Sequence, residues 1–203
     1  MATLASPYGL VPVKRADGMP YAGARSTYKI NPAGLASNLF YGQVVHINND
    51  GYVALSNATG ADGTTNALPT GTTLRGSIGV FVGCAYFNSE GQWIHSQMYP
   101  TGTTGVVEVY VVDDPDVLFR AQLDGAATQA AIGKNTFFAA AQSTSTGNAA
   151  TGKSTSALDA TVISTTAAFR VVEFASPVSD AFPDVLVKFN PGYHSMTNAV
   201  GAA

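Results

Sequence analysis

Charged residues are scarce in this sequence. Of its 203 residues, 10 are Lys or Arg and 13 are Asp or Glu, so 11% are charged and the net charge is −3. Soluble domains commonly carry about 25% charged residues, which help to keep monomers apart in solution. A surface so poor in charge is typical of a subunit that works in an assembly. The scattered basic residues also argue against nucleic-acid binding, which needs clustered Lys and Arg to neutralise phosphates.

The sequence also has a single cysteine and no long hydrophobic run. Cys84 is the single cysteine, so an internal disulfide is excluded, and its apolar neighbours predict a small buried side chain. No stretch approaches the roughly 20 apolar residues of a membrane span, and the first residues lack the basic start and apolar core of a secretory signal. The sequence therefore predicts a protein made in the cytoplasm with no membrane anchor.

The sequence is rich in short β-type runs. Segments of β-branched and aromatic residues recur between clusters of Gly, Asn, Asp and Pro, as is typical of strands and turns. The segments HINNDGYVAL and NSEGQW each predict a tight hairpin. Strands are expected at 26–30, 40–47, 51–55, 77–87, 92–98, 105–112, 117–122, 136–140, 167–174 and 184–190. The best helix candidate is the short Ala-rich stretch DGAATQAAIGKN. We therefore predict an all-β fold, an antiparallel β-sandwich or barrel.

The composition also suggests how the chain is divided. Residues 1–24 combine Pro and Gly with apolar side chains, which predicts an extended N-terminal arm that either folds back on its own domain or lies across a neighbour. Residues 25–190 are expected to form a single β-rich domain, followed by a C-terminal tail at 191–203. Within the domain, 56–76 and 142–166 are rich in Ser, Thr, Gly and Ala and are expected to be long polar loops.

One enzymatic motif is present. The segment GNAATGKS at Gly147–Ser154 fits the pattern of a phosphate-binding loop. Such a loop works only where it follows a buried strand and opens a helix, so that backbone N–H groups converge on the phosphates. The flanking segments QSTST and TSALDATVISTT have no helical period, and no apolar strand ending in Asp follows. We therefore interpret the match as a surface loop, and we predict neither a cofactor nor an enzymatic activity.

Metal sites are not predicted either. The acidic cluster at Asp113, Asp114 and Asp116 lacks the Gly and closing Glu of a calcium loop, so a strand-ending turn is the favoured interpretation and a structural cation the alternative. The three histidines are far apart in the sequence, at His46, His95 and His194. None has a ligand-type neighbour at the spacing of a metal site, so each is expected to make ordinary hydrogen bonds.

Three segments resemble a known family. SPYGLVPVKRADGMPYAG (6–23) is similar to its opening pattern, in which Gly, Pro and a basic pair precede Asp-Gly-x-Pro and an aromatic residue. VVDDPDVLFRAQ (111–122) resembles its central strand end, and DVLVKFNPGYHS (184–195) its closing strand. The family is that of the capsid cement, or head decoration, proteins encoded beside the major capsid protein of tailed phages. The chain departs from the family pattern in the polar loops at 56–76 and 142–166.

The resemblance implies a structural virion protein without enzymatic activity. Such a protein is expected to be trimeric, to sit on the outside of the expanded shell and to bridge subunits of the major capsid protein. An extended arm can bind by adding a strand to a sheet edge, and many weak contacts add up in a symmetric shell. The expected contact residues are the apolar anchors Leu10, Val11, Val13 and Tyr21, and the basic pair Lys14 and Arg15. Deletion of residues 1–24 is expected to leave a folded domain that no longer decorates shells.

Two other functions are compatible with the sequence. One is another phage structural protein associated with the tail or a fibre; a major capsid subunit is disfavoured because no long spine helix is predicted. The other is a carbohydrate-binding β module, in which Trp93, Tyr86 and Tyr99 would stack on sugars. The second function requires these three rings to gather on one exposed face.

Overall fold

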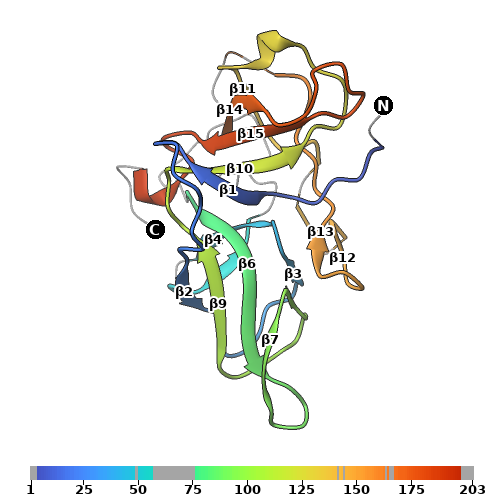
Figure 1. The fold of residues 1–203 in the computed structure, drawn as a ribbon. Helices are drawn as coiled ribbons and strands as arrows, with labels where there is room; N and C mark the ends of the chain where they lie inside the picture. Colours follow the sequence, from blue (N-terminus) through green and yellow to red (C-terminus); the bar gives the residue numbers. More distant parts are fainter. Residues whose placement is uncertain are drawn as a thin grey trace.

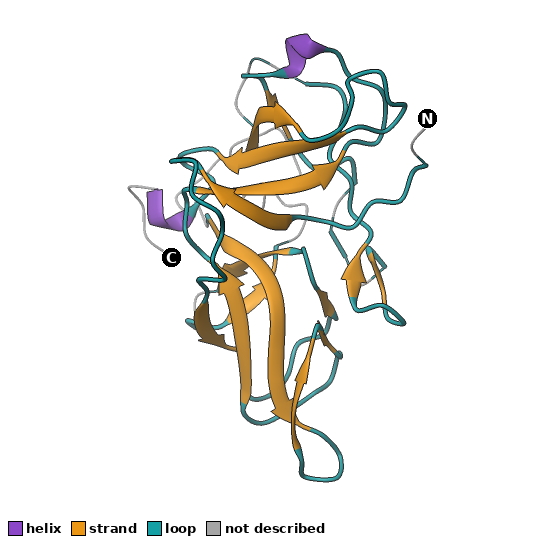
Figure 2. Cartoon of the chain, viewed as in Figure 1, coloured by secondary structure: helices purple, strands orange, loops and turns teal. Residues whose placement is uncertain are grey.

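The computed structural model describes residues 4–48, 50–56, 76–140, 142–143, 145–162, 164 and 167–197. Regular structure in these ranges is almost entirely antiparallel strand, which confirms the predicted all-β fold (Figures 1 and 2). The helical segments described are two single 3-10 turns, Gln129–Ala131 and Ser195–Thr197. The Ala-rich stretch at 124–135 therefore forms one turn and not a helix. No helix in the described ranges is long and apolar enough to cross a membrane.

Two main sheets pack together as a sandwich. The five-stranded sheet has the order β1-β10-β15-β14-β11, and the six-stranded sheet has the order β2-β9-β6-β4-β5 with β7 added beside β6 (Figure 1). The first comprises β1 (Val11–Arg15), β10 (Val117–Gln122), β15 (Asp184–Phe189), β14 (Phe169–Phe174) and β11 (Asn135–Thr136). The second comprises β2 (Ser26–Lys29), β9 (Val107–Val112), β6 (Ser77–Phe87), β4 (Val44–Ile47), β5 (Val53–Leu55) and β7 (Trp93–Ser96). Two short pairs complete the fold, β3 (Leu39–Phe40) with β8 (Met98–Tyr99) and β12 (Gly147–Asn148) with β13 (Lys153–Ser154).

Both predicted hairpins are present, joining β4 to β5 and β6 to β7. Each turn begins with an Asn, Asn48 or Asn88, whose Oδ1 accepts hydrogen bonds from the backbone N–H groups two and four residues later. Each also has a glycine with positive φ, 80° at Gly51 and 75° at Gly91, which other residues adopt at a cost. Side-chain hydrogen bonding by Asn and the conformational freedom of Gly therefore set the turn in both hairpins.

Two cores lie on opposite faces of the six-stranded sheet. The inter-sheet core contains Val80 of β6 and Val112 of β9, packed with Phe119 and other apolar residues of the five-stranded sheet. The lower core lies on the other face and contains Phe81 and Cys84 of β6 with residues of β3, β8 and β9. Cys84 is fully buried as predicted, and burial raises the pKa of its thiol to about 12. Strand β6 therefore serves both cores.

The extended arm expected at residues 1–24 is not confirmed as a separate segment. Val11–Arg15 forms the edge strand β1, which pairs with β10, and Leu10 is fully buried in the inter-sheet core. The chain then turns back, and Arg15 and Tyr21 donate backbone N–H groups to the carbonyls of Met19 and Val13. Apolar burial and backbone pairing thus hold this segment to its own domain. Removing residues 1–24 would expose β10 and open the core, contrary to the expectation of an intact domain.

The two polar loops differ in what the structure describes. Residues 57–75 of the first lie outside the described residues. The second contains the β12–β13 hairpin, and Leu158 fills part of the inter-sheet core. The buried Gln142 amide bonds both the N–H and the carbonyl of Val44, at 2.9 and 3.2 Å, much as a neighbouring strand would. The second loop is therefore packed against the sandwich.

The burial of Leu10 predicts a large loss of stability when its side chain is truncated. Leu10→Ala is expected to lower the free energy of unfolding by about 2–5 kcal/mol, because it leaves a cavity in the inter-sheet core. Val13→Ala is the matched control in the same segment, since Val13 is 41% exposed, and it should cost less than about 1 kcal/mol. Urea unfolding followed by circular dichroism measures both. Equal losses would contradict the core position of Leu10.

Candidate functional site

The three segments that resemble cement proteins lie side by side. They contribute β1, β10 and β15, which are neighbours in the five-stranded sheet although they are far apart in the sequence (Figure 1). Val11 is opposite Arg120 at one end of the β1–β10 pair, and Phe119 is opposite Val187 in the β10–β15 pair. The segments therefore form one continuous piece of sheet.

Charged side chains connect these strands and their neighbour β14. The ion pairs are Lys14–Glu173, Arg15–Asp114, Arg120–Asp184 and Lys188–Asp116. The Lys14 and Lys188 ammonium groups each lie 2.6 Å from their carboxylate. The bond from Lys188 lowers the pKa of the Asp116 carboxyl below its ordinary value. Because the pairs are partly exposed, each is expected to contribute only about 0.2–1 kcal/mol, and they serve mainly to fix the relative position of the strands.

The acidic cluster forms the turn between β9 and β10. The Tyr28 hydroxyl donates to Asp113 at 2.7 Å, and Asp114 accepts the backbone N–H of Asp116 at 2.9 Å. These contacts are those of the predicted strand-ending turn. Within the described ranges, no group of three or more His, Cys, Asp or Glu residues is arranged to hold a metal ion.

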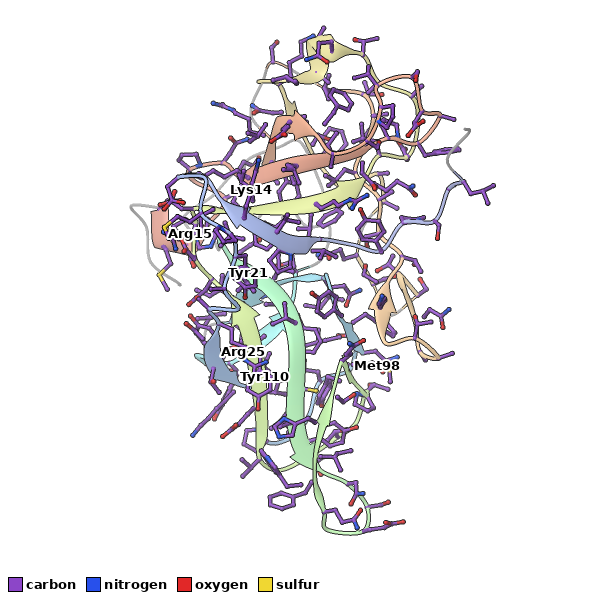
Figure 3. The ribbon with its side chains drawn as sticks, in the orientation of Figure 1. Lys14, Arg15, Tyr21, Arg25, Met98 and Tyr110 are labelled. Atoms are coloured by element: carbon purple, nitrogen blue, oxygen red, sulfur yellow. The ribbon has the colours of Figure 1, made fainter. Side chains whose placement is uncertain are left out.

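The predicted contact residues fall into four environments. Leu10 is fully buried in the inter-sheet core. Val13 is 41% exposed, whereas Tyr21 is half-buried and donates its hydroxyl to the carbonyl of Ala24 at 2.6 Å. Val11 lines a cavity of about 260 Å³ together with Tyr8, Tyr41, Gln97 and Lys153. Lys14 and Arg15 are held in ion pairs near the turn after β1 (Figure 3).

A stacked group of side chains was missed by the sequence reasoning. The Arg25 guanidinium lies over the Tyr110 ring with its Cζ 4.0 Å from the centroid, and Figure 3 shows the two below Tyr21 on the same side of the molecule. The His95 ring is stacked with the Tyr110 ring at 6.2 Å, and its Nδ1 is 3.4 Å from the Tyr110 hydroxyl. These residues line a shallow hollow of about 200 Å³. Their wide separation in the sequence gives no local signal.

The segment that matches a phosphate-binding loop is a hairpin. Gly147–Asn148 and Lys153–Ser154 pair as β12 and β13, and no helix follows within the described residues of this segment. Gly147 is packed so closely on Phe40 that an added Cβ would lie 2.0 Å from its ring. The strand-to-helix geometry that directs N–H groups at a phosphate is therefore not present here; the segment is a hairpin in which Ser154 is buried.

The three rings proposed for sugar stacking do not gather on one face. Tyr99 is fully buried, and Tyr86 packs against the lower core. Trp93 is 38% exposed and contacts Phe87, with the ring centroids 4.8 Å apart. The arrangement required for the carbohydrate-binding function is thus not met by these residues.

His194 is the most buried of the three histidines. It is 1% exposed, its Nδ1 accepts the backbone N–H of Met196 at 3.2 Å, and its ring meets Phe189 edge-on at 5.3 Å. Burial lowers the pKa of His194, and the carboxylates of Asp113 and Asp114 oppose this shift in part. The imidazole is therefore neutral in the folded protein at neutral pH.

Comparison with protein-family models, with curated proteins and with solved structures finds no match to this chain.

The environment of His194 predicts a loss of stability in mild acid. The unfolded chain binds a proton at this residue below about pH 6.5, whereas the folded chain resists protonation because its pKa is lowered. The free energy of unfolding should therefore fall as the pH drops below 6.5, by at most about 1.4 kcal/mol per pH unit. Urea titrations between pH 7.5 and 5 should show a smaller slope for His194→Gln than for the wild type.

The matched control for this measurement is His95→Gln. His95 is exposed, so this variant measures the effect of replacing a histidine on the surface. If His194→Gln kept the wild-type slope, the burial of a neutral imidazole would not be the cause of the pH dependence.

Proposed function

We propose that this chain is a structural protein of a phage virion. In this proposal it is a cement protein that binds the outside of the capsid as a homotrimer and stabilises the shell by bridging subunits of the major capsid protein. It needs neither enzymatic activity nor a cofactor.

The observation that carries the proposal is the convergence of the three resembling segments. Short similarities that arise by chance have no reason to meet in space. Here they supply three neighbouring strands of one sheet, and Arg15–Asp114, Arg120–Asp184 and Lys188–Asp116 connect these segments in pairs. A shared unit of sheet with its own cross-links is what a family resemblance would preserve, which supports the cement-protein assignment.

The composition gives independent support. Because 11% of the residues are charged, little repulsion opposes the close packing of copies on a shell. A trimer that touches several capsid subunits multiplies weak contacts, since each attachment raises the effective concentration of the next. Such a protein gains firm attachment without a single strong contact.

The burial of Leu10 changes the part of residues 1–24 that is available for binding. In the proposal the capsid contact is the outer side of β1 and the turn that follows it. Val13 and Met19 are 41% and 62% exposed there and supply apolar contact. Lys14 and Arg15 already have carboxylate partners in Glu173 and Asp114, so an acidic capsid residue would compete with these pairs.

Addition of the purified protein to expanded shells that lack it tests the proposal. The shells are assembled from the major capsid protein of the same phage. Electron microscopy is expected to show trimeric density at symmetry-related positions on the outer surface, and decorated shells should withstand more heat or denaturant than bare ones. Shells that remain bare at saturating protein concentration would refute the proposed function.

A pair of variants tests the proposed contact. Val13→Asp places a charge on the outer side of β1 and is expected to weaken co-sedimentation with shells about tenfold. Val172→Asp is the matched control, because Val172 is 39% exposed on β14 of the same sheet, and it should bind as the wild type does. Equal binding by both variants and the wild type would exclude β1 as the contact.

A further inference from the structure

The six-stranded sheet has an exposed face below the inter-sheet core. In β6, Cys84 and Tyr86 point into the lower core, so Phe87 points to the opposite side of the sheet. Near the top of the sheet that side is covered, because Val80 and Val112 pack there against the five-stranded sheet. Toward the β6–β7 hairpin, which projects away from the five-stranded sheet (Figure 1), the same side bears exposed residues. We call this lower region the outer face.

An apolar row on the outer face is formed by residues of β6 and β7 and by the residue that precedes β9. Phe87 is opposite Trp93 in the β6–β7 pair. Tyr86 is opposite Val107 in the β6–β9 pair, which brings Val106 beside Phe87. The exposed fractions are 54% for Phe87, 38% for Trp93 and 62% for Val106. Single exposed apolar residues are ordinary on protein surfaces, but three in register form a contiguous patch of the kind found at interaction sites.

A fixed cation lies on the same face. Tyr110 is four residues beyond Val106 along β9, which corresponds to about 13 Å, and Arg25 is stacked on its ring. Tyr110 lies opposite Gly83, which has no side chain to displace the ring, and it contacts His95 on β7. The stack orders the guanidinium while its N–H groups stay free to bind a carboxylate in bidentate fashion.

Arg25 differs from the arginines whose N–H groups are bonded within the chain; Arg170, for example, donates to the Oδ1 of Asn135. Arg15 and Arg120 each pair with a carboxylate, whereas among the described residues no carboxylate lies within ion-pair distance of Arg25. The outer face also carries Lys29 opposite Glu108, whose charges cancel, so Arg25 is the cation without a carboxylate on this face of a chain whose net charge is −3. The face is therefore complementary to an acidic surface.

Neither a second outer face nor the acidic cluster of a second copy is suited to supply that acidic surface. Two outer faces brought together would oppose the same excess of positive charge. The densest group of carboxylates, at Asp113, Asp114 and Asp116, is already bonded to Tyr28, Arg15 and Lys188 of its own chain. The carboxylate that meets Arg25 is therefore expected on a different protein, and the oligomeric state of the variants tests the alternative that a second copy supplies it.

We infer that the outer face is a second docking surface, for a different protein that receives Phe87 and Trp93 in an apolar hollow and presents a carboxylate to Arg25. Within the proposed function, on which this inference rests, that protein is the major capsid protein. Aromatic and Arg side chains are the residue types that dominate binding energy at interfaces. Contacts at β1 and at the outer face would let one chain touch two capsid subunits, which is what bridging requires.

Binding of variants to expanded shells of the same phage's major capsid protein tests the inference. The double variant Phe87→Ser/Trp93→Ser and the charge reversal Arg25→Glu are each expected to bind at least about tenfold more weakly than the wild type. The wild-type affinity should fall with added NaCl, and that of Arg25→Glu should depend less on salt. The matched controls are Ile132→Ser, 39% exposed on another part of the surface, and Lys134→Glu, also exposed; both should bind within about twofold of wild type. Circular dichroism verifies that every variant is folded.

Three results would overturn the inference, and they are distinguishable. If the wild type does not bind shells, the proposed function is refuted and the inference fails with it. If the wild type binds and both outer-face variants bind equally well, the inference alone is refuted. If these variants lose binding and also change from trimer to monomer in sedimentation velocity, the outer face is a contact between copies of the chain and not a docking surface for another protein.

Discussion

The position of β10 between β1 and β15 is the constraint on which the rest of the sandwich depends. With a neighbour on each side, β10 has its backbone groups paired in the sheet. It also carries Phe119 into the inter-sheet core, where its ring meets that of Phe189 edge-on at 5.7 Å. Phe189 in turn lies 4.9 Å from the ring of Phe169. One strand thus joins the N-terminal segment, the C-terminal strand and the aromatic part of the core.

Strand β6 connects the inter-sheet core to the lower core, because it contributes residues to both. It can serve two cores because glycines interrupt it at close approaches: a Cβ at Gly79 would lie 2.1 Å from the carbonyl oxygen of Val112. The pairing of β6 with β9 shifts register between Phe81 and Gly83, and such bulges re-aim the side chains that follow. At Gly83, which is opposite Tyr110, an added Cβ would lie 3.1 Å from the carbonyl oxygen of Ser96 on β7. The strand that completes both cores therefore also determines the form of the outer face.

Alternating apolar residues and turn signals allowed most strands and both Asn-initiated hairpins to be predicted, because these signals are local. The sequence predicts an extended arm where the strand Val11–Arg15 lies, because Pro12 lacks an N–H and disfavours a central strand. Pro12 is tolerated because β1 is an edge strand with a bulge between Pro12 and Lys14. The stack of Arg25 on Tyr110 could not be predicted, because its partners meet only through the pairing of β2 with β9.

Because the protein has few charged residues, an arginine without a carboxylate partner on the outer face is informative about binding. In a highly charged protein an unpaired arginine would be one of many and would indicate little. Here Lys14, Arg15, Arg120 and Lys188 around β1, β10 and β15 are paired with carboxylates of the same chain, and Arg170 of β14 donates to Asn135. Arg25 lies outside this network, yet its stack on Tyr110 holds it in place. Because ordering a long side chain costs entropy, a guanidinium that is ordered before binding loses less on contact with a carboxylate. An ordered cation beside an apolar row would allow a partner to be recognised by both charge and shape.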